Sequence, residues 1–286
     1  MENKKVKLIE CPRDAMQGWK SFIPTAIKIN YINALLQVGF DTIDFGSFVS
    51  PKAIPQMADT VDVLKGLKVE NLTTKLLAIV ANVRGAEEAV LHEAISYLGF
   101  PFSISSTFQL RNTNTTLLAS LDSVADIQKL CIKNHKKLVV YISMGFGNPY
   151  GDDYNETIVN FWVDKMVQIG VEIISIADTV GLATAEQISS VLQSLIPAYP
   201  GIEIGVHLHS TAANWQAKVD AALLAGCNRF DGALKGIGGC PMAGDVLVGN
   251  MDTGLMIPYF KQQNLLNGID LKALEKCNRM ASEIFV

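Results

Sequence analysis

The chain alternates between short apolar runs and longer amphipathic stretches, and this alternation limits the folds open to it. Eight apolar runs read as strands, at residues 6–11, 42–48, 75–80, 102–108, 137–144, 172–179, 202–210 and 229–236. Segments between them, such as 26–39 and 156–170, carry apolar residues at three- and four-residue spacing and end at glycine, as helices do. A strand followed by a helix, eight times over, predicts an α/β fold of the (β/α)8 TIM-barrel type, with an open doubly wound sheet as the alternative.

The length favours one barrel rather than two smaller units. All 286 residues fit a single catalytic domain, 1–286, and no linker rich in proline, serine or glycine interrupts the alternation. We expect the last helical segment, about 255–286, to pack on the barrel. Because 49% of the residues are hydrophobic and only 18% are charged, the chain can form a sizeable core.

Charge and hydropathy exclude several kinds of partner. The formal net charge is −4 and no run of lysine or arginine suits a nucleic-acid backbone, so we expect no nucleic-acid partner. The sequence shows no apolar stretch of signal-peptide or membrane-spanning length, which predicts no membrane association and a cytoplasmic location. Five scattered cysteines without a CxxC pair argue against a disulfide framework or a zinc knuckle.

Polar residues occur where the expected strands end. Barrel enzymes place their chemistry at these carboxyl ends and in the loops that follow. In a closed barrel the eighth strand lies beside the first, so polar residues from strands seven, eight, one and two should meet. These residues are Arg13, Asp14, Asp44, His207, His209 and Cys240, with Asp178 at the end of the sixth strand.

A histidine pair is the strongest candidate for a metal site. Side chains two residues apart on a strand point to the same face, so His207 and His209 can reach one ion; one core and one exposed histidine is the other interpretation. Asp14 adds a carboxylate, and Asn250, expected at the start of the last helix, adds a neutral oxygen, although either could be a helix cap. This ligand set suits Mg²⁺ or Mn²⁺ and leaves zinc open.

A glycine-rich segment, 235–250, contains the one cysteine with distinctive neighbours. Its glycines would let the backbone approach a ligand, and the loop could act as a lid. Cys240, held over a metal site, could give or take a proton. The segment matches neither GxGxxG nor a Walker sequence, so a nucleotide site is the poorer interpretation.

Five segments carry motifs of a known family, in the same order and at similar spacing. They are "PRDAMQGWK" at 12–20, "SFVSPKAIPQMAD" at 47–59, "ADTVGLAT" at 177–184, "VHLH" at 206–209 and "GIGGCPMA…GN" at 236–250. Together they resemble the 3-hydroxy-3-methylglutaryl-CoA lyase family, and the resemblance runs from about residue 5 to 260. The cysteine loop separates this family from the isopropylmalate and citramalate synthases of the same metal-dependent barrel superfamily.

The resemblance implies a role for each matching residue. Four positions match the family's metal ligands: Asp14, His207, His209 and Asn250. Arg13 matches the arginine that stabilises an enolate, Cys240 the catalytic loop cysteine, and Asp178 an aspartate near the substrate. We therefore predict Arg13, Asp14, Cys240 and His207 as catalytic residues and Arg13, Gln17, Asp44 and Asp178 as substrate-binding residues. Lys20 matches a further polar position of the opening motif.

The chain also departs from the family pattern. Asp44 stands where the family usually has glutamate, Ser210 where an aspartate commonly follows the second histidine, and Gly254 where an acidic residue is usual. The spacing from Cys240 to Asn250 is one residue longer than in the pattern, and "GALKG" replaces "SVAG".

The resemblance implies divalent-metal-dependent cleavage of an acyl-CoA, 3-hydroxy-3-methylglutaryl-CoA or a close relative, to acetyl-CoA and acetoacetate by a homodimer. Two other functions compete with it. One is a Claisen-type acyltransferase, which the absence of a regulatory domain disfavours; the other is a metal-binding barrel without catalysis.

Overall fold

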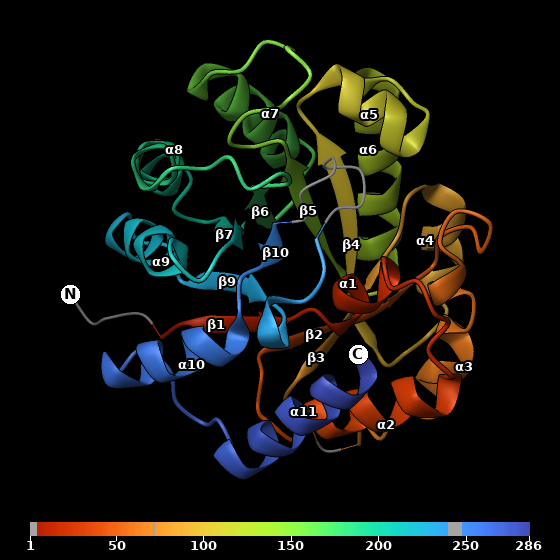
Figure 1. The fold of residues 1–286 in the computed structure, drawn as a ribbon. Helices are drawn as coiled ribbons and strands as arrows, with labels where there is room; N and C mark the ends of the chain where they lie inside the picture. Colours follow the sequence, from red (N-terminus) through yellow and green to blue (C-terminus); the bar gives the residue numbers. More distant parts are fainter. Residues whose placement is uncertain (1–4, 71, 240–247) are drawn as a thin grey trace.

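The computed structural model describes residues 5–70, 72–239 and 248–286, and in it eight parallel strands close into a barrel (Figure 1). The closure is direct: β9 pairs with β1 from Lys7 opposite Arg229 to Glu10 opposite Gly232. The predicted TIM barrel is confirmed and the open sheet is wrong. The strands are β1 (Lys7–Glu10), β2 (Thr42–Ser47), β3 (Lys75–Ile79), β4 (Ile95–Ser103), β5 (Lys137–Ser143), β6 (Ile173–Ala177), β7 (Glu203–His207) and β9 (Arg229–Gly232).

Helices surround the barrel, and a small antiparallel pair of strands lies outside it. This pair joins β8 (His209–Ser210) to β10 (Gly249–Asn250). The helices are α1 (Pro12–Gln17), α2 (Thr25–Leu35), α3 (Thr60–Lys65), α4 (Val83–Ala89), α5 (Ser106–Thr113), α6 (Leu117–Lys133), α7 (Glu156–Gln168), α8 (Ala185–Ala198), α9 (Trp215–Leu224), α10 (Thr253–Gln262) and α11 (Leu271–Ile284), with 3-10 turns at Pro55–Met57 and Leu234–Gly236.

The fourth strand differs from the prediction of 102–108. β4 begins at Ile95 and ends at Ser103, and the following residues enter α5, which Ser105 caps by accepting a hydrogen bond from the Phe108 amide. Gly99 and Pro101 interrupt the apolar run and concealed the strand. Gly99 is needed here because a Cβ would lie 2.5 Å from the Ile79 side chain inside the barrel.

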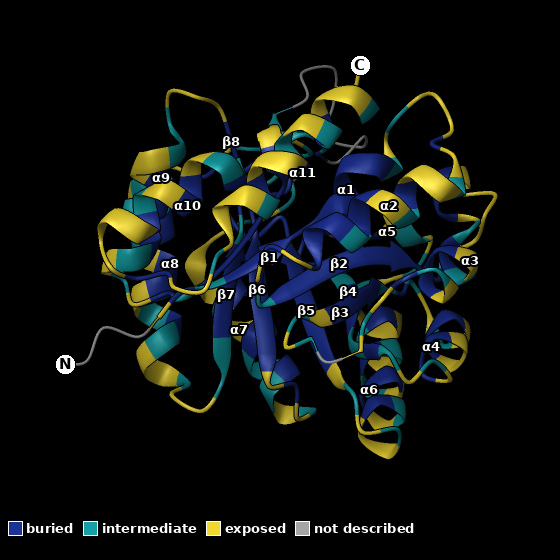
Figure 2. Cartoon of the chain, turned by 90° about the horizontal axis from the view of Figure 1, so that it is seen from below, coloured by how far each residue is buried: buried dark blue, intermediate teal, exposed yellow. Residues whose placement is uncertain are grey.

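Apolar packing occupies two regions. The larger lies between the barrel and its helices, whose outer faces are exposed while the strands are buried (Figure 2). The smaller lies inside the barrel and contains Leu77, Val139, Tyr141 and Ile173. Inward positions on other strands carry charged side chains, one of which is Arg229. Gly205 makes room for it, because a Cβ added at residue 205 would lie 2.8 Å from Cδ of Arg229. The barrel interior is therefore apolar on one side and charged on the other.

The last helix packs against the first part of the chain. α11 lies beside α2 (Figure 1), and the ring of Phe285 meets Trp19 edge-on at 5.3 Å between centroids. Among the described residues, no helix is both long and apolar enough to cross a membrane. Four cysteines, Cys11, Cys131, Cys227 and Cys277, are buried and unpaired; Cys240 lies outside the described residues.

Candidate active site

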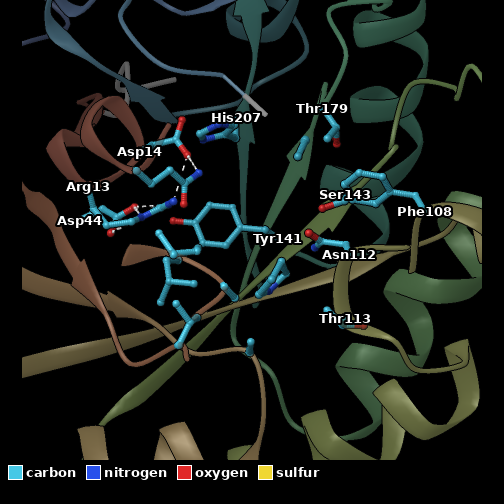
Figure 3. Close-up of a pocket in the computed structure, with 18 of the residues that line it drawn as sticks. Arg13, Asp14, Asp44, Phe108, Asn112, Thr113, Tyr141, Ser143, Thr179 and His207 are labelled. Carbon is cyan, nitrogen blue, oxygen red and sulfur yellow. Dashed lines mark hydrogen bonds and ion pairs between the residues drawn. The ribbon is translucent and has the colours of Figure 1, made fainter. Parts of the chain in front are cut away.

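A cavity of about 390 Å³ opens at the carboxyl ends of the strands, where the sequence predicts the chemistry. Most of the charged side chains gather on one side of it and neutral polar side chains lie on the other, with the Tyr141 ring between them (Figure 3). The charged group contains Arg13, Asp14, Asp44, His207 and His209, the opposite side contains Asn112, Thr113, Ser143 and Thr179, and the apolar lining includes Val49, Ala53, Ile54, Ile79, Ala81, Pro101 and Phe108. One further charged residue, Arg111 of α5, lines the cavity next to Asn112.

Arg13 is held by two aspartates. It lies in α1, which starts with Pro12 at its first position directly after β1, and proline suits that position because its missing N–H would have no helical partner. Nη2 and Nε of Arg13 donate to Oδ2 of Asp44 at 2.6 and 3.0 Å, and Nη1 donates to Asp14 at 3.0 Å. Although burial favours the neutral acid, the charge of Arg13 holds the pKa of Asp14 below its ordinary value.

His207 ends β7 and is oriented by Asp231 on the neighbouring β9. Its Nδ1 lies 3.2 Å from Oδ2 of Asp231, and because a carboxylate accepts, Nδ1 donates and Nε2 faces the cavity side of the ring. Burial alone would lower the pKa of His207, but the hydrogen bond and charge of Asp231 raise it above the ordinary value. A carboxylate behind the ring is a common support for a metal-binding histidine.

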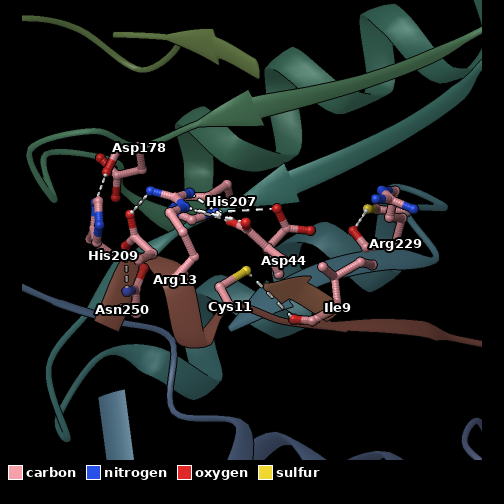
Figure 4. Close-up of polar contacts among 12 residues, drawn as sticks. Ile9, Cys11, Arg13, Asp44, Asp178, His207, His209, Arg229 and Asn250 are labelled. Carbon is pink, nitrogen blue, oxygen red and sulfur yellow. Dashed lines mark hydrogen bonds and ion pairs between the residues drawn. The ribbon is translucent and has the colours of Figure 1, made fainter. Parts of the chain in front are cut away.

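The sequence predicted His209 on the seventh barrel strand, and this is wrong. His209 lies in β8, outside the barrel, opposite Asn250 of β10. Nδ1 of His209 is 2.6 Å from the backbone oxygen of Asp178, and since a carbonyl only accepts, the ring proton sits on Nδ1 (Figure 4). Nε2 is buried and has no hydrogen-bond partner among the described residues. Burial, and then the neighbouring His207, lower the pKa of His209 and favour the neutral ring.

Asn250 lies in β10 rather than at the start of a helix, because pairing with β8 extends the chain there; α10 begins three residues later. Its Nδ2 donates to Asp14 at 2.7 Å and to the Ile237 carbonyl at 2.9 Å. Oδ1 is buried without a partner among the described residues. Gly238, with φ of +98°, lies against this amide, and a Cβ there would come within 2.7 Å of it. The glycine-rich segment therefore does bring its backbone onto the site.

These four residues fit a divalent cation. Ligand atoms of Asp14, His207 and His209 lie within 4.8 Å of one another, and the amide of Asn250 contacts Asp14. In this cluster, two buried atoms have no partner within the described parts of the chain, Nε2 of His209 and Oδ1 of Asn250, and both are acceptors. A set of two imidazoles, one carboxylate and one amide oxygen suits Mg²⁺, Mn²⁺ or zinc.

The other predicted residues fall into three groups. Gln17 and Asp44 both line the cavity; Gln17 donates to Asp14 at 2.8 Å, and Asp44 accepts from Arg13. Asp178 is buried, does not line the cavity and forms an ion pair with Lys218, so the structure does not place its carboxylate where a substrate-binding group would be. Cys240, with residues 240–247, lies outside the described residues.

Sequence reasoning missed several residues that shape the site. Asp231 and Lys218 support the two histidines, and Tyr141 meets the His207 ring edge-on at 5.9 Å. Asp231 lies on an expected strand, two residues beyond Arg229, so strand alternation could have placed it inside the barrel. Lys218 looked like an ordinary helix lysine, and its sequence carries no sign of burial.

Comparison with known proteins shows the family and the fold to which the chain is similar. The HMGL-like family matches residues 5–281. Hydroxymethylglutaryl-CoA lyase YngG of Bacillus subtilis is 33% identical over 95% of this chain and 90% of its own length. A Pseudomonas aeruginosa 3-hydroxy-3-isohexenylglutaryl-CoA/hydroxymethylglutaryl-CoA lyase is 31% identical over 95% of this chain and 90% of its own.

A solved structure shares the whole fold. The HMG-CoA lyase from Acinetobacter baumannii, determined with coenzyme A and 3-methylmalate, superposes with a TM-score of 0.91 at 29% identity, covering 100% of this chain and 92% of its own. Family, relatives and structure agree along nearly the whole chain. The chain thus belongs to the HMGL-like family, and it is a lyase of the hydroxymethylglutaryl-CoA lyase type.

Proposed function

We propose that this chain is a divalent-metal-dependent carbon–carbon lyase that cleaves 3-hydroxy-3-methylglutaryl-CoA, or a close 3-hydroxyacyl-CoA, to acetyl-CoA and acetoacetate. One observation carries the proposal: a buried arginine lies beside a cluster of two imidazoles, a carboxylate and an amide at one side of the cavity. This cluster leaves two buried acceptor atoms without partners among the described residues, and both can bind a cation. Mg²⁺ or Mn²⁺ is the ion we propose.

Arg13 stabilises the charge that develops during cleavage. The reaction removes the proton of the C3 hydroxyl and breaks the C2–C3 bond; its electrons form the thioester enolate while C3 becomes a ketone. Of the five N–H groups of a guanidinium, three of those on Arg13 bind Asp14 and Asp44, so two remain for the enolate oxygen. The aspartates fix the guanidinium before substrate binds, which makes this contact effective in the transition state.

The remaining groups hold the substrate and move protons. A bound divalent cation supplies Lewis-acid and orienting chemistry for the substrate oxygens. The carboxylate of Asp14 can take the hydroxyl proton, and a hydrogen bond from Gln17 orients this carboxylate. For Cys240 we retain the sequence prediction: its thiol, protonated at neutral pH, returns a proton to the enolate carbon and yields acetyl-CoA.

An acetoacetate assay tests the proposal. Purified protein with Mg²⁺ or Mn²⁺ should release equal amounts of acetoacetate and acetyl-CoA, and a chelator should abolish the release. Cys240→Ser should lose most turnover and still bind metal. Arg279→Met, which changes an exposed arginine of α11, serves as the control and should keep wild-type activity. The proposal fails if the wild-type protein cleaves no 3-hydroxyacyl-CoA.

A substrate panel refines the acyl group and separates the alternatives. The P. aeruginosa relative is described as acting on a substrate with a longer 3-substituent, so the panel should include 3-alkyl groups larger than methyl. Release of free CoA from acetyl-CoA and a 2-oxo acid would indicate the acyltransferase instead. Metal binding without turnover of any acyl-CoA would indicate a non-catalytic barrel.

We also propose that the chain works in the cytoplasm as a homodimer without a nucleic-acid partner. The family resemblance supports the dimer, and the absence of basic runs in the sequence supports the last point. Light scattering on the purified chain tests the dimer, since a monomer mass at micromolar concentration would contradict it.

A further inference from the structure

A buried lysine lies directly behind the second histidine of the metal cluster. Lys218 belongs to α9 and is only 2% exposed. Its Nζ has three acceptors: Oδ2 of Asp178 and the backbone oxygen of His209, both at 2.7 Å, and the backbone oxygen of Gly181 at 3.4 Å. An ammonium group has three N–H bonds, so each can be directed at one acceptor.

Asp178 connects this lysine to the histidine ring. Its carboxylate accepts from Lys218 and from the Ala183 amide at 3.0 Å, while its backbone oxygen accepts from Nδ1 of His209 at 2.6 Å. Its backbone N–H donates to the His207 carbonyl at 2.9 Å. One residue therefore joins Lys218, the ring of His209 and the main chain of His207.

The two histidines are supported in different ways. Behind His207 stands the carboxylate of Asp231, a strong acceptor on a barrel strand. Behind His209 stands a backbone carbonyl in the loop after β6, and a carbonyl holds a ring only as firmly as its loop is held. Ser210, where the family pattern has an aspartate, directs its hydroxyl to the sulfur of Met251. The Lys218–Asp178 ion pair is the charged support of that loop, and it adds to the backbone hydrogen bonds of Asp178 and Ala183.

A buried ion pair contributes little to stability in comparison with apolar side chains of the same size, and fixing one arrangement of the chain is its best-supported use. We propose that Lys218 is a positioning residue for the metal site: with Asp178 it fixes the carbonyl that selects the Nδ1–H form of His209 and keeps Nε2 directed at the cation. The inference rests on the proposed metal dependence. It also assigns Asp178 a positioning role in place of the substrate contact predicted from the sequence.

The test measures metal binding and ring protonation rather than turnover. Lys218→Met keeps most of the unbranched side chain and removes its charge and donors. We expect the affinity for Mn²⁺, measured by calorimetry without substrate, to fall about 10- to 100-fold. In metal-free protein, ¹⁵N NMR should show His209 in the Nδ1–H form in the wild type and in a mixture of both neutral forms in the variant.

Lys28→Met is the matched control. Lys28 is also 2% exposed and pairs with an aspartate, Asp59, at 2.7 Å, but it lies in α2, away from the cluster. This variant should lose stability as Lys218→Met does while its Mn²⁺ affinity stays within about 2-fold of wild type. Asp178→Asn preserves the backbone carbonyl and the shape of the side chain and should also weaken Mn²⁺ binding. If Lys218→Met does not fold, the Mn²⁺ affinity of Asp178→Asn tests the inference.

Two outcomes would overturn the inference in distinguishable ways. If wild-type protein binds no Mn²⁺, the proposed metal dependence fails and this inference fails with it. If wild type binds Mn²⁺ and both Lys218→Met and Asp178→Asn bind it equally well with an unchanged His209 spectrum, the positioning role alone is wrong.

Discussion

The two ends of the barrel both contain charged side chains, arranged differently. At the amino end, Arg229 donates to Glu203 at 3.0 Å and Lys7 pairs with the same carboxylate. At the carboxyl end, Arg13 pairs with Asp44 and Asp14. The cavity is lined by the second group and by none of the first.

The two ends also differ in whether their buried atoms without hydrogen-bond partners are donors or acceptors. Within the described chain, the buried atoms without hydrogen-bond partners on Arg229 are the donors Nε and Nη2, whereas those on His209 and Asn250 are acceptors. A cation binds to acceptor atoms and not to N–H donors, so the free atoms at the carboxyl end, rather than those of Arg229, suit a divalent ion. This division agrees with the general pattern of α/β barrels, which place chemistry at one end and stability at the other. Four substitutions can break or sharpen it.

Arg13→Met should have the largest effect, because it removes the positive charge beside the metal cluster. We expect kcat to fall by about 10²- to 10³-fold, in line with the loss of a donor to a developing oxyanion. Steady-state acetoacetate release measures it, and circular dichroism checks the fold. Arg13→Lys should recover only part of the activity, since an ammonium cannot bridge two aspartates in the same plane. Wild-type turnover in Arg13→Met would remove Arg13 from the mechanism.

Arg229→Met should act on stability instead. Breaking a buried ion pair by removing one partner costs about 3 kcal/mol or more when the other charge stays buried. In this variant Glu203 still pairs with Lys7, so we expect the free energy of unfolding to fall by about 2–3 kcal/mol. The value of kcat should stay within about 2-fold of wild type. Urea unfolding gives the first value. A large fall in kcat without destabilisation would contradict the division between the two ends.

Glu10→Gln should change how stability depends on pH. Burial raises the pKa of Glu10 from 4.5 to about 8, so between these values the unfolded chain has lost a proton that the folded protein keeps. The free energy of unfolding therefore falls as the pH rises from about 4.5 to 8. The glutamine variant should be clearly more stable than wild type at pH 8 and equally stable at pH 4. Identical unfolding curves at pH 8 would rule this out.

Lys7→Met should have the smallest effect. The Lys7 side chain is 42% exposed, and exposed ion pairs contribute about 0–1 kcal/mol. We expect a change in the free energy of unfolding below about 1 kcal/mol that vanishes in high salt. A loss as large as that of Arg229→Met would mean that Lys7, rather than Arg229, holds Glu203 in place.

Features encoded by residues close together in the chain were predicted well. Apolar periodicity placed seven of the eight barrel strands and the helices at 26–39 and 156–170, because strand and helix patterns repeat over a few residues. The fourth strand was misplaced because glycine and proline broke its pattern while distant neighbours still paired with it.

The sequence alone determined the barrel, the end of it that carries the site and the histidine pair, since the spacing of His207 and His209 is local. Only the tertiary structure decided how that pair is supported. The amide of Asn250 meets Asp14 across 236 residues of sequence, and Lys218 reaches Asp178 across 40. Such contacts depend on how strands and helices pack. Lys218, which the sequence suggests is a surface residue, is therefore buried behind the site, and Asp178, predicted at the cavity, pairs with it there.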